Sequence, residues 1–555
     1  MRLTPAVRAL VLASALLSHT AASLAAQSDT WALTNARIQT VTRGVIEKGT
    51  ILIRKGLIEA VGPTVTVPAD ARVIDLAGKT VTPGIFDLTS SLGLPAAPTP
   101  GGGGGAPAGG GGQQAQAATA PRPGLSPERQ IAAEIRLTSA EVKPLRDAGI
   151  TAVLVSPTRG LFRGMSALVP LRDDADAGSV IKSQVAEHIG YQGAQGGYPG
   201  TLLGVIAYQR QALFDAQRQG VLQDRYKSNP RGMERPENDP GLDALVPVVR
   251  GQVPAFIEAG NENEIRRAVR LAKEFNLKMT IVGATEGWQA VDALAGRPTI
   301  VSVNFPAPAA VTGWSYRLSQ RRGPGDSATS ARAAQRIIEG NAAALNTAGV
   351  KFALASGGSR DFLPNVRKAV AAGLPASVAL EALTIRAAEI TGVGEMLGSI
   401  EAGKIANLVV SSTDLLSDSA RVSAVFVDGI RYEVAPPPPA RTGGGGGAAG
   451  SAAPAAQVAG AWTMTLTSPQ GPLEVAMTLV QNGTSFTGTM TSSVGSQEIS
   501  DGQINGRNLT WSATLQMGGQ SITLNYRGEV DGNRMSGSAE LGSFGSATFT
   551  AERKP

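Results

Sequence analysis

The middle of the chain alternates short apolar runs with longer segments of helical period. The apolar runs end in turn signals, as is typical of strands buried on both faces, and they lie at 150–157, 299–306 and 351–356. Residues 253–288 read as strand–helix–strand, and the pair Asn261 and Glu264 predicts a capping box at the start of that helix. Repeated units of this kind over about three hundred residues predict a (β/α)8 barrel or a doubly wound sheet.

The two ends of the chain have a period of two instead. Residues 31–82 are short β-branched runs separated by Gly and Pro signals, which predicts a small β domain. Residues 457–555 alternate polar and apolar positions over about eight runs, which predicts an antiparallel barrel or sandwich. The turn-forming pairs in this second segment are Asn482-Gly483, Asp501-Gly502, Asn505-Gly506 and Asp531-Gly532.

Two segments lack either period. Residues 95–125 are rich in Pro, Gly, Gln and Ala, and such a composition cannot bury enough apolar surface to offset its ordering entropy. We therefore predict a disordered, low-complexity insertion there. Residues 435–456 begin with an alanine and four prolines and continue mainly in Gly and Ala, which predicts a linker between two domains.

Residues 1–26 have the pattern of a secretory signal peptide. Arg2 and Arg8 precede the apolar core 9–17, and small residues follow at 23–26. The apolar core is well short of the ~20 residues that a membrane span needs. We expect an exported protein, periplasmic or secreted, without a membrane span.

Composition narrows the chemistry further. The chain has no Cys and two His, and because His19 lies in the predicted leader, only His188 would remain after cleavage. A His-rich metal site is therefore excluded, and the polar stretch before His188 predicts a surface position for it. The net charge of +6 is modest, and no cluster of Lys and Arg alternates with aromatic residues, so nucleic-acid binding is not expected.

The segment 83–93, PGIFDLTSSLG, resembles the first barrel strand of the amidohydrolase superfamily, whose pattern is PG-apolar-apolar-D-x-H-x-H. Residues 397–434 resemble the closing run of the same superfamily, in its imidazolonepropionase-like group. The resemblance implies a (β/α)8 TIM barrel at 83–396, with a composite β-sandwich built from residues 27–82 and 397–434. The segment 457–555 would then be a separate all-β domain.

The resemblance also places the metal ligands of the family on this chain. Zinc or another divalent metal is the norm in the family, held by four His and one Asp. The aligned positions here are Thr89, Ser91, Glu258, Gly283 and Gly357. A neutral hydroxyl is a poor zinc ligand and glycine has no side chain, so only Glu258 offers a charged donor. We expect no metal cofactor.

Other acids and hydroxyls lie near the predicted strand ends. The pocket candidates are Glu258, Ser356 and Asp361, and no catalytic residue is assigned. Asp87 is interpreted as a structural carboxylate, and Glu286 as a solvated loop residue. The resulting hypothesis is a pseudoenzyme that binds a small-molecule ligand, or that assembles with itself or with an intact homologue. The alternative is a hydrolase of non-peptide C–N bonds, such as those of cyclic amides, with a rebuilt active site.

Overall fold

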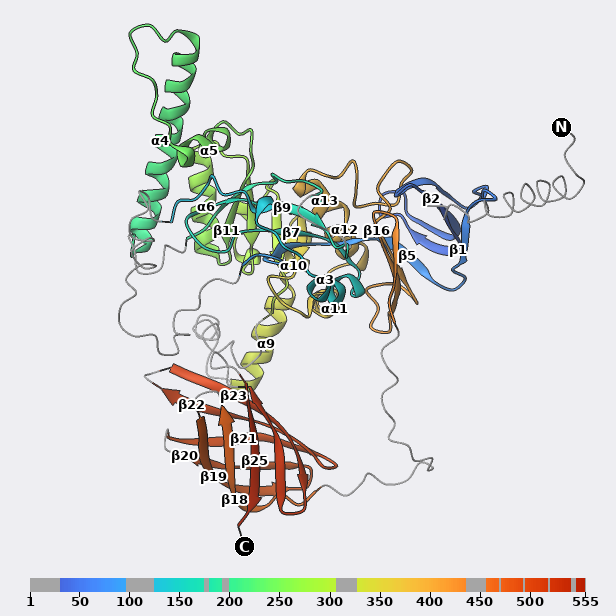
Figure 1. Ribbon diagram of the computed structural model, residues 1–555, viewed down its shortest axis with the longest axis vertical. Helices are drawn as coiled ribbons and strands as arrows, with labels where there is room; N and C mark the ends of the chain where they lie inside the picture. The colour runs from blue at the N-terminus through green and yellow to red at the C-terminus, as the bar shows by residue number, and fades with distance from the viewer. Residues whose placement is uncertain are drawn as a thin grey trace, which may run out of the picture. The chain divides into compact units, whose positions relative to one another are not determined.

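The computed structural model describes residues 30–95, 124–173, 179–191, 199–305, 327–435, 456–468, 471–492, 495–517, 520–540 and 546–554. The chain divides into two compact units, Met1–Pro437 and Pro438–Pro555 (Figure 1). The predicted signal peptide lies outside the described residues. So do almost all of the predicted insertion and of the predicted linker.

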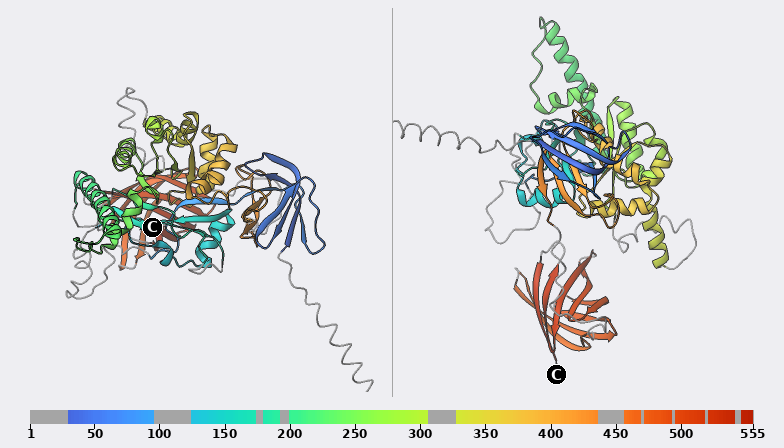
Figure 2. Two further views of the ribbon diagram at one scale, coloured as in Figure 1. Left: turned by 90° about the horizontal axis from the view of Figure 1, so that it is seen from above. Right: turned by 90° about the vertical axis from the view of Figure 1, so that its right-hand side faces the viewer.

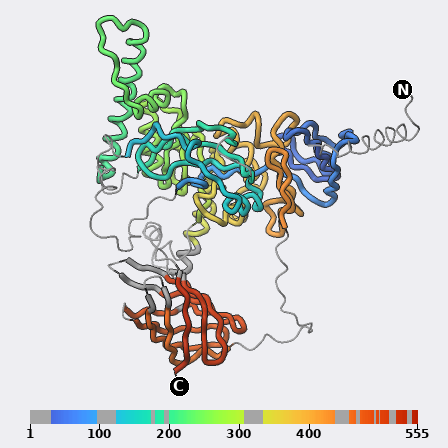
Figure 3. The backbone as a smooth tube through the Cα atoms, in the orientation of Figure 1, coloured from blue at the N-terminus to red at the C-terminus, as the bar shows by residue number. Residues whose placement is uncertain are grey.

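The two flanks of the first unit pair with each other in one eight-stranded sheet. The junction is the antiparallel pairing of Leu408 with Pro83 through Ser411 with Thr80. Figure 3 shows the N-terminal and C-terminal flanks of this unit side by side. The predicted composite arrangement is confirmed. Its strands are β1 (Thr30–Gln39), β2 (Val45–Arg54), β3 (Leu57–Gly62), β4 (Arg72–Asp75), β5 (Thr80–Pro83), β15 (Leu408–Ser411), β16 (Val422–Val427) and β17 (Ile430–Glu433).

The strands between the flanks form a barrel of the TIM type. Strands β10 to β14 are parallel neighbours in chain order, and β6 and β7 form a second parallel pair. The barrel is not uniformly parallel, because β9 runs antiparallel to β7 and β8 antiparallel to β10. The strands are β6 (Ile85–Ser90), β7 (Ile150–Val155), β8 (Phe162–Met165), β9 (Ala167–Pro170), β10 (Glu187–Ile189), β11 (Ala255–Ala259), β12 (Met279–Gly283), β13 (Thr299–Ser302) and β14 (Phe352–Ala355).

Side-chain hydrogen bonds join the first and the last barrel strand. The Asp87 carboxylate on β6 accepts from Ser356 N after β14 at 2.9 Å, and Thr89 Oγ1 accepts from Gly357 N at 2.8 Å. Alternate residues of successive strands, such as Phe86, Phe256 and Ile300, form one buried cluster that fills the barrel. The predicted barrel is thus confirmed, with β6 beside β14.

Helices cover the outside of these strands. Helix α6 has the predicted capping box, since Asn261 Oδ1 accepts from Glu264 N at 3.0 Å and the Glu264 carboxylate accepts from Asn261 N. Helix α4 is the longest and stands out from the barrel in Figure 1. No helix of the described part is long and apolar enough to cross a membrane. The helices are η1 (Ile131–Ala133), α3 (Ser139–Asp147), α4 (Leu202–Ser228), α5 (Pro240–Val249), α6 (Glu262–Glu274), η2 (Gly287–Gln289), α7 (Val291–Leu294), α9 (Ser327–Glu339), α10 (Asn341–Thr347), α11 (Phe362–Ala371), α12 (Ala376–Leu383) and α13 (Ile385–Thr391).

The second unit is a closed barrel of eight antiparallel strands (Figure 2). Large apolar and aromatic side chains fill it, among them Trp462, Trp511 and Phe549. Three of the four predicted turn pairs do turn the chain, but Asp501-Gly502 lies within β21. There a Cβ on Gly502 would be 2.4 Å from Phe486 O, so glycine allows a close strand approach. The strands are β18 (Gly460–Ser468), β19 (Gly471–Asn482), β20 (Ser485–Ser492), β21 (Gly495–Asn505), β22 (Asn508–Met517), β23 (Gln520–Asp531), β24 (Arg534–Glu540) and β25 (Ser546–Arg553).

Candidate functional site

A cavity of about 450 Å³ opens at the carboxyl ends of the parallel strands of the first barrel. This is the end at which barrels of this type bind ligands, because the loops after the strands converge there. All five positions aligned with the metal ligands of the family line the cavity: Thr89, Ser91, Glu258, Gly283 and Gly357. The structure therefore brings together residues that are up to 268 positions apart, as the hydrogen bond between Thr89 and Gly357 shows.

The end of β6 is occupied by internal hydrogen bonds. Asp87 is 5% exposed, and its Oδ1 accepts from Thr89 N at 3.2 Å and from Ser356 N at 2.9 Å. The register of β6 against β7 shifts between Asp87 and Ser90, and consequently Thr89, Ser90 and Ser91 all reach the cavity. The structural role inferred for Asp87 agrees with these contacts.

Two of the aligned positions have a backbone conformation that favours glycine. Gly283 has φ of +107° and Gly357 has φ of +61°, both in the left-handed region that other residues rarely adopt. A Cβ on Gly357 would lie 1.9 Å from Ser302 Oγ. No side-chain ligand fits at Gly357 unless Ser302 moves.

Glu258 is the one charged residue among the five, and it is already paired. Its carboxylate forms an ion pair with Arg163 of β8. The Arg163 side chain is 1% exposed, whereas that of Glu258 is 42% exposed. Arg163 Nε donates to Gly160 O at 2.9 Å, and an added Cβ on Gly190 would lie 2.0 Å from Arg163 Nη2. The guanidinium is therefore held behind the carboxylate by a tight protein surround.

His188 does not lie on the surface, so this prediction was wrong. It is 2% exposed, lies on β10 beside Phe256 with ring centroids 5.5 Å apart, and lines the cavity. Burial, and secondarily the charge of Arg163, lowers the pKa of His188 to about 3, so its imidazole is neutral. Neither ring nitrogen has a hydrogen-bond partner among the described residues. The apolar residues Val185, Ala186 and Ile189 around it were the available signal for a short strand.

The preceding residue, Glu187, is a second buried ionisable group that the sequence analysis missed. It is 1% exposed, and its Oε1 accepts from Gly164 N at 3.0 Å. Burial raises the pKa of Glu187 well above its ordinary value. Because neighbours on a strand point to opposite faces, Glu187 lies outside the barrel and His188 inside it.

The other candidates do not line the cavity. Ser356 is buried and its Oγ accepts from Gly358 N at 3.1 Å. Asp361 is exposed at the start of α11, where its side chain caps no backbone group. Glu286 is not solvated as predicted. It is 7% exposed and accepts from Glu262 N, so it joins the end of β12 to the start of α6.

Hydroxyl groups make up much of the remaining lining. The side-chain hydroxyls of Ser91, Ser156 and Thr158 form no hydrogen bond within the described residues, and the hydroxyls of Ser90 and Ser302 each accept a backbone N–H nearby. No Lys or Arg among the described residues lines the cavity. The second acid of the lining, Glu264, is held by the backbone N–H groups of Gly260 and Asn261. The cavity therefore offers neutral donors and acceptors.

The family metal does not fit this set of donors. Within the described parts of the chain, no group of three His, Cys, Asp or Glu side chains could hold a metal ion. Among the described residues of the lining, the acids and imidazoles are Glu258, which is bound to Arg163, Glu264, which is held by two backbone N–H groups, and His188. A catalytic zinc site takes three protein ligands and a water.

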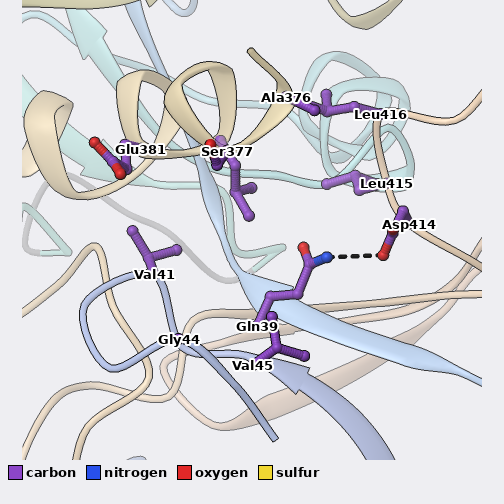
Figure 4. A pocket seen from close by; sticks show the side chains of 11 residues that line it. Gln39, Val41, Gly44, Val45, Ala376, Ser377, Glu381, Asp414, Leu415 and Leu416 are labelled. Carbon is purple, nitrogen blue, oxygen red and sulfur yellow. Dashed lines mark hydrogen bonds between the residues drawn. The ribbon is translucent and has the colours of Figure 1, made fainter. Parts of the chain in front are cut away.

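A second cavity, of about 310 Å³, lies between the β1–β2 turn and helix α12 (Figure 4). Val41 and Val45 face Ser377 across it, and one wall carries the hydrogen bond from Gln39 Nε2 to Asp414 Oδ1 at 2.7 Å. It includes none of the five aligned positions. The sequence analysis does not single out any residue of this cavity.

Comparison with known proteins points to one family. Residues 253–431 match the model of the amidohydrolase family. The amidohydrolase from Thermotoga maritima MSB8 has a similar structure, with a TM-score of 0.58 and 21% identity over 72% of this chain and 99% of that one.

Other similar structures are more distant. A Xaa-Pro dipeptidase has a TM-score of 0.43 and 16% identity over 73% of this chain and 100% of that one. An adenosine deaminase from Xanthomonas campestris has a TM-score of 0.39 and 17% identity over 73% of this chain and 93% of that one. A search of curated proteins found no match. The segment 253–431 thus matches the amidohydrolase family, and the first unit shares its fold with the amidohydrolase from Thermotoga maritima.

Proposed function

We propose that the cavity at the barrel mouth binds a small ligand without a catalytic metal, and that the protein is a non-catalytic member of its family. The observation that carries this proposal is the pairing of Glu258 with the buried Arg163. The one carboxylate among the five aligned positions already has a cation, and glycine stands at two others. What remains is a cavity of about 450 Å³ with several hydroxyl groups in its wall, a size typical of small-molecule sites.

Elemental analysis of the purified protein tests the absence of a metal. After growth with added zinc and exhaustive dialysis, we expect a metal-to-protein ratio near zero. A ratio near one that falls in Glu258→Ala would overturn the proposal, because it would mean that a rebuilt metal site exists.

Ligand-observed NMR with a library of polar small molecules tests binding. Ser156→Trp fills the cavity and should abolish the signals of bound compounds. Ser419→Trp, at an exposed loop position, should leave them unchanged. If no compound distinguishes the two variants, the cavity is not a ligand site.

The alternative is a metal-free hydrolase of cyclic amides, and the location of His188 is the observation in its favour. His188 and Glu258 lie on the neighbouring strands β10 and β11, and both line the cavity. However, a neutral imidazole whose pKa is about 3 is a weak general base. Hydrolysis of a panel of cyclic amides that disappears in His188→Ala but not in Glu274→Gln would favour the alternative.

We also propose that the protein is exported and assembles with itself or with an intact homologue. The leader pattern at 1–26 supports export. The support for assembly is that the barrel keeps its alternation of strands and helices although the five aligned positions lack the His and Asp residues of the family. Mass spectrometry should find the mature chain starting near Gln27, and light scattering should find a complex larger than one chain. A cytoplasmic chain with residues 1–26 intact, or a monomer without a co-purifying homologue, would contradict the respective proposal.

A further inference from the structure

The ion pair of Arg163 and Glu258 decides which charge a ligand of the cavity can carry. We propose that the site selects neutral, hydroxyl-rich compounds of the size and chemistry of a sugar, which Glu258 binds as a hydrogen-bond acceptor. This inference rests on the proposed function and specifies its ligand class.

The charges around the cavity restrict the ligand first. Of the described residues that line the cavity, only Glu258 and Glu264 are acidic, and none is a Lys or Arg. An anionic ligand would therefore meet carboxylates and no exposed cation. A cationic ligand would find Glu258 already neutralised by Arg163, and Glu264 already bound by two backbone N–H groups. A neutral ligand would not bury an unpaired charge in the cavity.

The position of the guanidinium is also fixed. Arg163 is 1% exposed, Gly160 O accepts from its Nε, and the missing side chain of Gly190 provides the space that its Nη2 occupies. Arg163 therefore cannot swing into the cavity to meet an anion. It stays behind Glu258, and the carboxylate presents its exposed part to the cavity.

The cavity also supplies hydrogen-bonding groups. A carboxylate accepts two hydroxyl donors at once, as adjacent hydroxyls of a sugar provide. The ring of His188 lines the cavity, but both of its nitrogens are buried and offer a ligand no hydrogen bond there. Ser91, Ser156 and Thr158 add hydroxyls without partners in the described part of the chain. Together these groups match a ligand that both donates and accepts hydrogen bonds.

The test compares three probes that share one ring: glucose, which is neutral, glucosamine, a cation, and glucuronate, an anion. Saturation-transfer NMR titrations with the full-length protein should show glucose binding at least about tenfold more tightly than the other two. Glu258→Gln removes the negative charge that faces the cavity and leaves the positive charge of Arg163 behind it uncompensated. We expect it to weaken glucose about tenfold and to reverse the preference toward glucuronate.

Glu274→Gln is the matched control. Glu274 on α6 also pairs with an arginine, Arg210, but both side chains are partly exposed, at 34% and 48%. The control should leave the order of the three probes unchanged. If Glu258→Gln does not fold, as judged by its unfolding transition, Ser91→Ala with Ser156→Ala provides the second variant. It should weaken glucose several-fold without changing the charge preference.

Several outcomes would overturn the inference: tightest binding of glucosamine or glucuronate to the native protein, an unchanged preference in Glu258→Gln, or no binding of any probe. These outcomes differ from failure of the proposed function. If the sugars fail while other library compounds still bind in a way that Ser156→Trp abolishes, only the ligand class is wrong. If a stoichiometric metal is found, the proposed function itself is wrong.

Discussion

At the scale of single residues, backbone conformation and backbone hydrogen bonds shape several of the positions aligned with the family's metal ligands. Gly283 and Gly357 adopt left-handed conformations, and the N–H of Gly357 bonds to Thr89 Oγ1, itself an aligned ligand position. Returning His to 283 and Asp to 357 would therefore strain the fold before it could hold a metal.

A pair of glycine substitutions measures this strain. Gly357→Ala should destabilise the first unit by about 3 kcal/mol. The alanine backbone would have to stay in the left-handed conformation, and its Cβ would overlap Ser302 Oγ. Gly358→Ala is the control, since its φ is +82° but no atom lies within 4 Å of the added Cβ. It should cost about 1 kcal/mol by urea unfolding. Equal effects of the two substitutions would contradict the contact with Ser302.

His188 makes the first unit sensitive to acid. Its pKa is about 3 in the folded protein, below the ordinary value of 6.5, so the unfolded chain binds the proton first. The contribution of His188 to stability is complete above pH 6.5 and is lost as the pH falls toward 3. In that window, His188 alone should lower the free energy of unfolding by about 1.4 kcal/mol per pH unit.

His188→Phe is expected to remove this part of the pH dependence while keeping a ring beside Phe256. Urea unfolding of both proteins between pH 6.5 and pH 4 measures the difference in slope. If the free energy of unfolding had the same pH slope in both proteins, His188 would have to be accessible to water, which its burial contradicts.

At the scale of elements, a short strand and a helix start position the site. Strand β10 has three residues and sends Glu187 outward and His188 inward. The start of α6 holds Glu264 by its capping box, which keeps the second acid of the cavity occupied. In both elements the backbone decides where the side chains of the site lie.

Asn261→Ala tests the start of α6. Asn261 Oδ1 accepts from Glu264 N at 3.0 Å, and loss of an N-cap side chain costs about 1 kcal/mol. Lys273→Ala, in the exposed last turn of the same helix, should change stability by less than about 0.5 kcal/mol. Thermal unfolding of the two variants gives the comparison, and an Asn261→Ala effect no larger than that of Lys273→Ala would exclude a stabilising cap.

At the scale of the whole molecule, two hydrophobic cores support two units. The barrel and flanks of Met1–Pro437 have their own clusters, and the eight-stranded barrel of Pro438–Pro555 has another, centred on aromatic residues such as Trp511 and Tyr526. A core that is complete within one unit predicts independent folding.

Limited proteolysis followed by calorimetry tests this independence. We expect cleavage within 436–455, because exposed segments of this Pro/Gly/Ala composition are preferred sites of nicking. The two fragments should stay soluble and unfold at the same temperatures as in the intact chain. A single transition in the intact chain that splits only after cleavage would mean that the two units stabilise each other.

The sequence by itself determined the periodic features of this protein. Buried strands such as 299–302, the capping box at Asn261 and the alternation in 457–555 are local patterns, and each was readable because its period or spacing is set by backbone geometry. The resemblance at 83–93 and 397–434 then placed the five aligned positions, and the structure brings all five to one cavity.

Only the tertiary structure decided the electrostatics of the site. The partnership of Arg163 with Glu258 joins residues 95 positions apart, and the burial of His188 depends on strands that pack around it. The turn pair Asp501-Gly502 became part of a strand because Phe486 of the neighbouring strand comes close to it. Charge pairing, burial and close backbone approach depend on distances between remote segments, which no local pattern encodes.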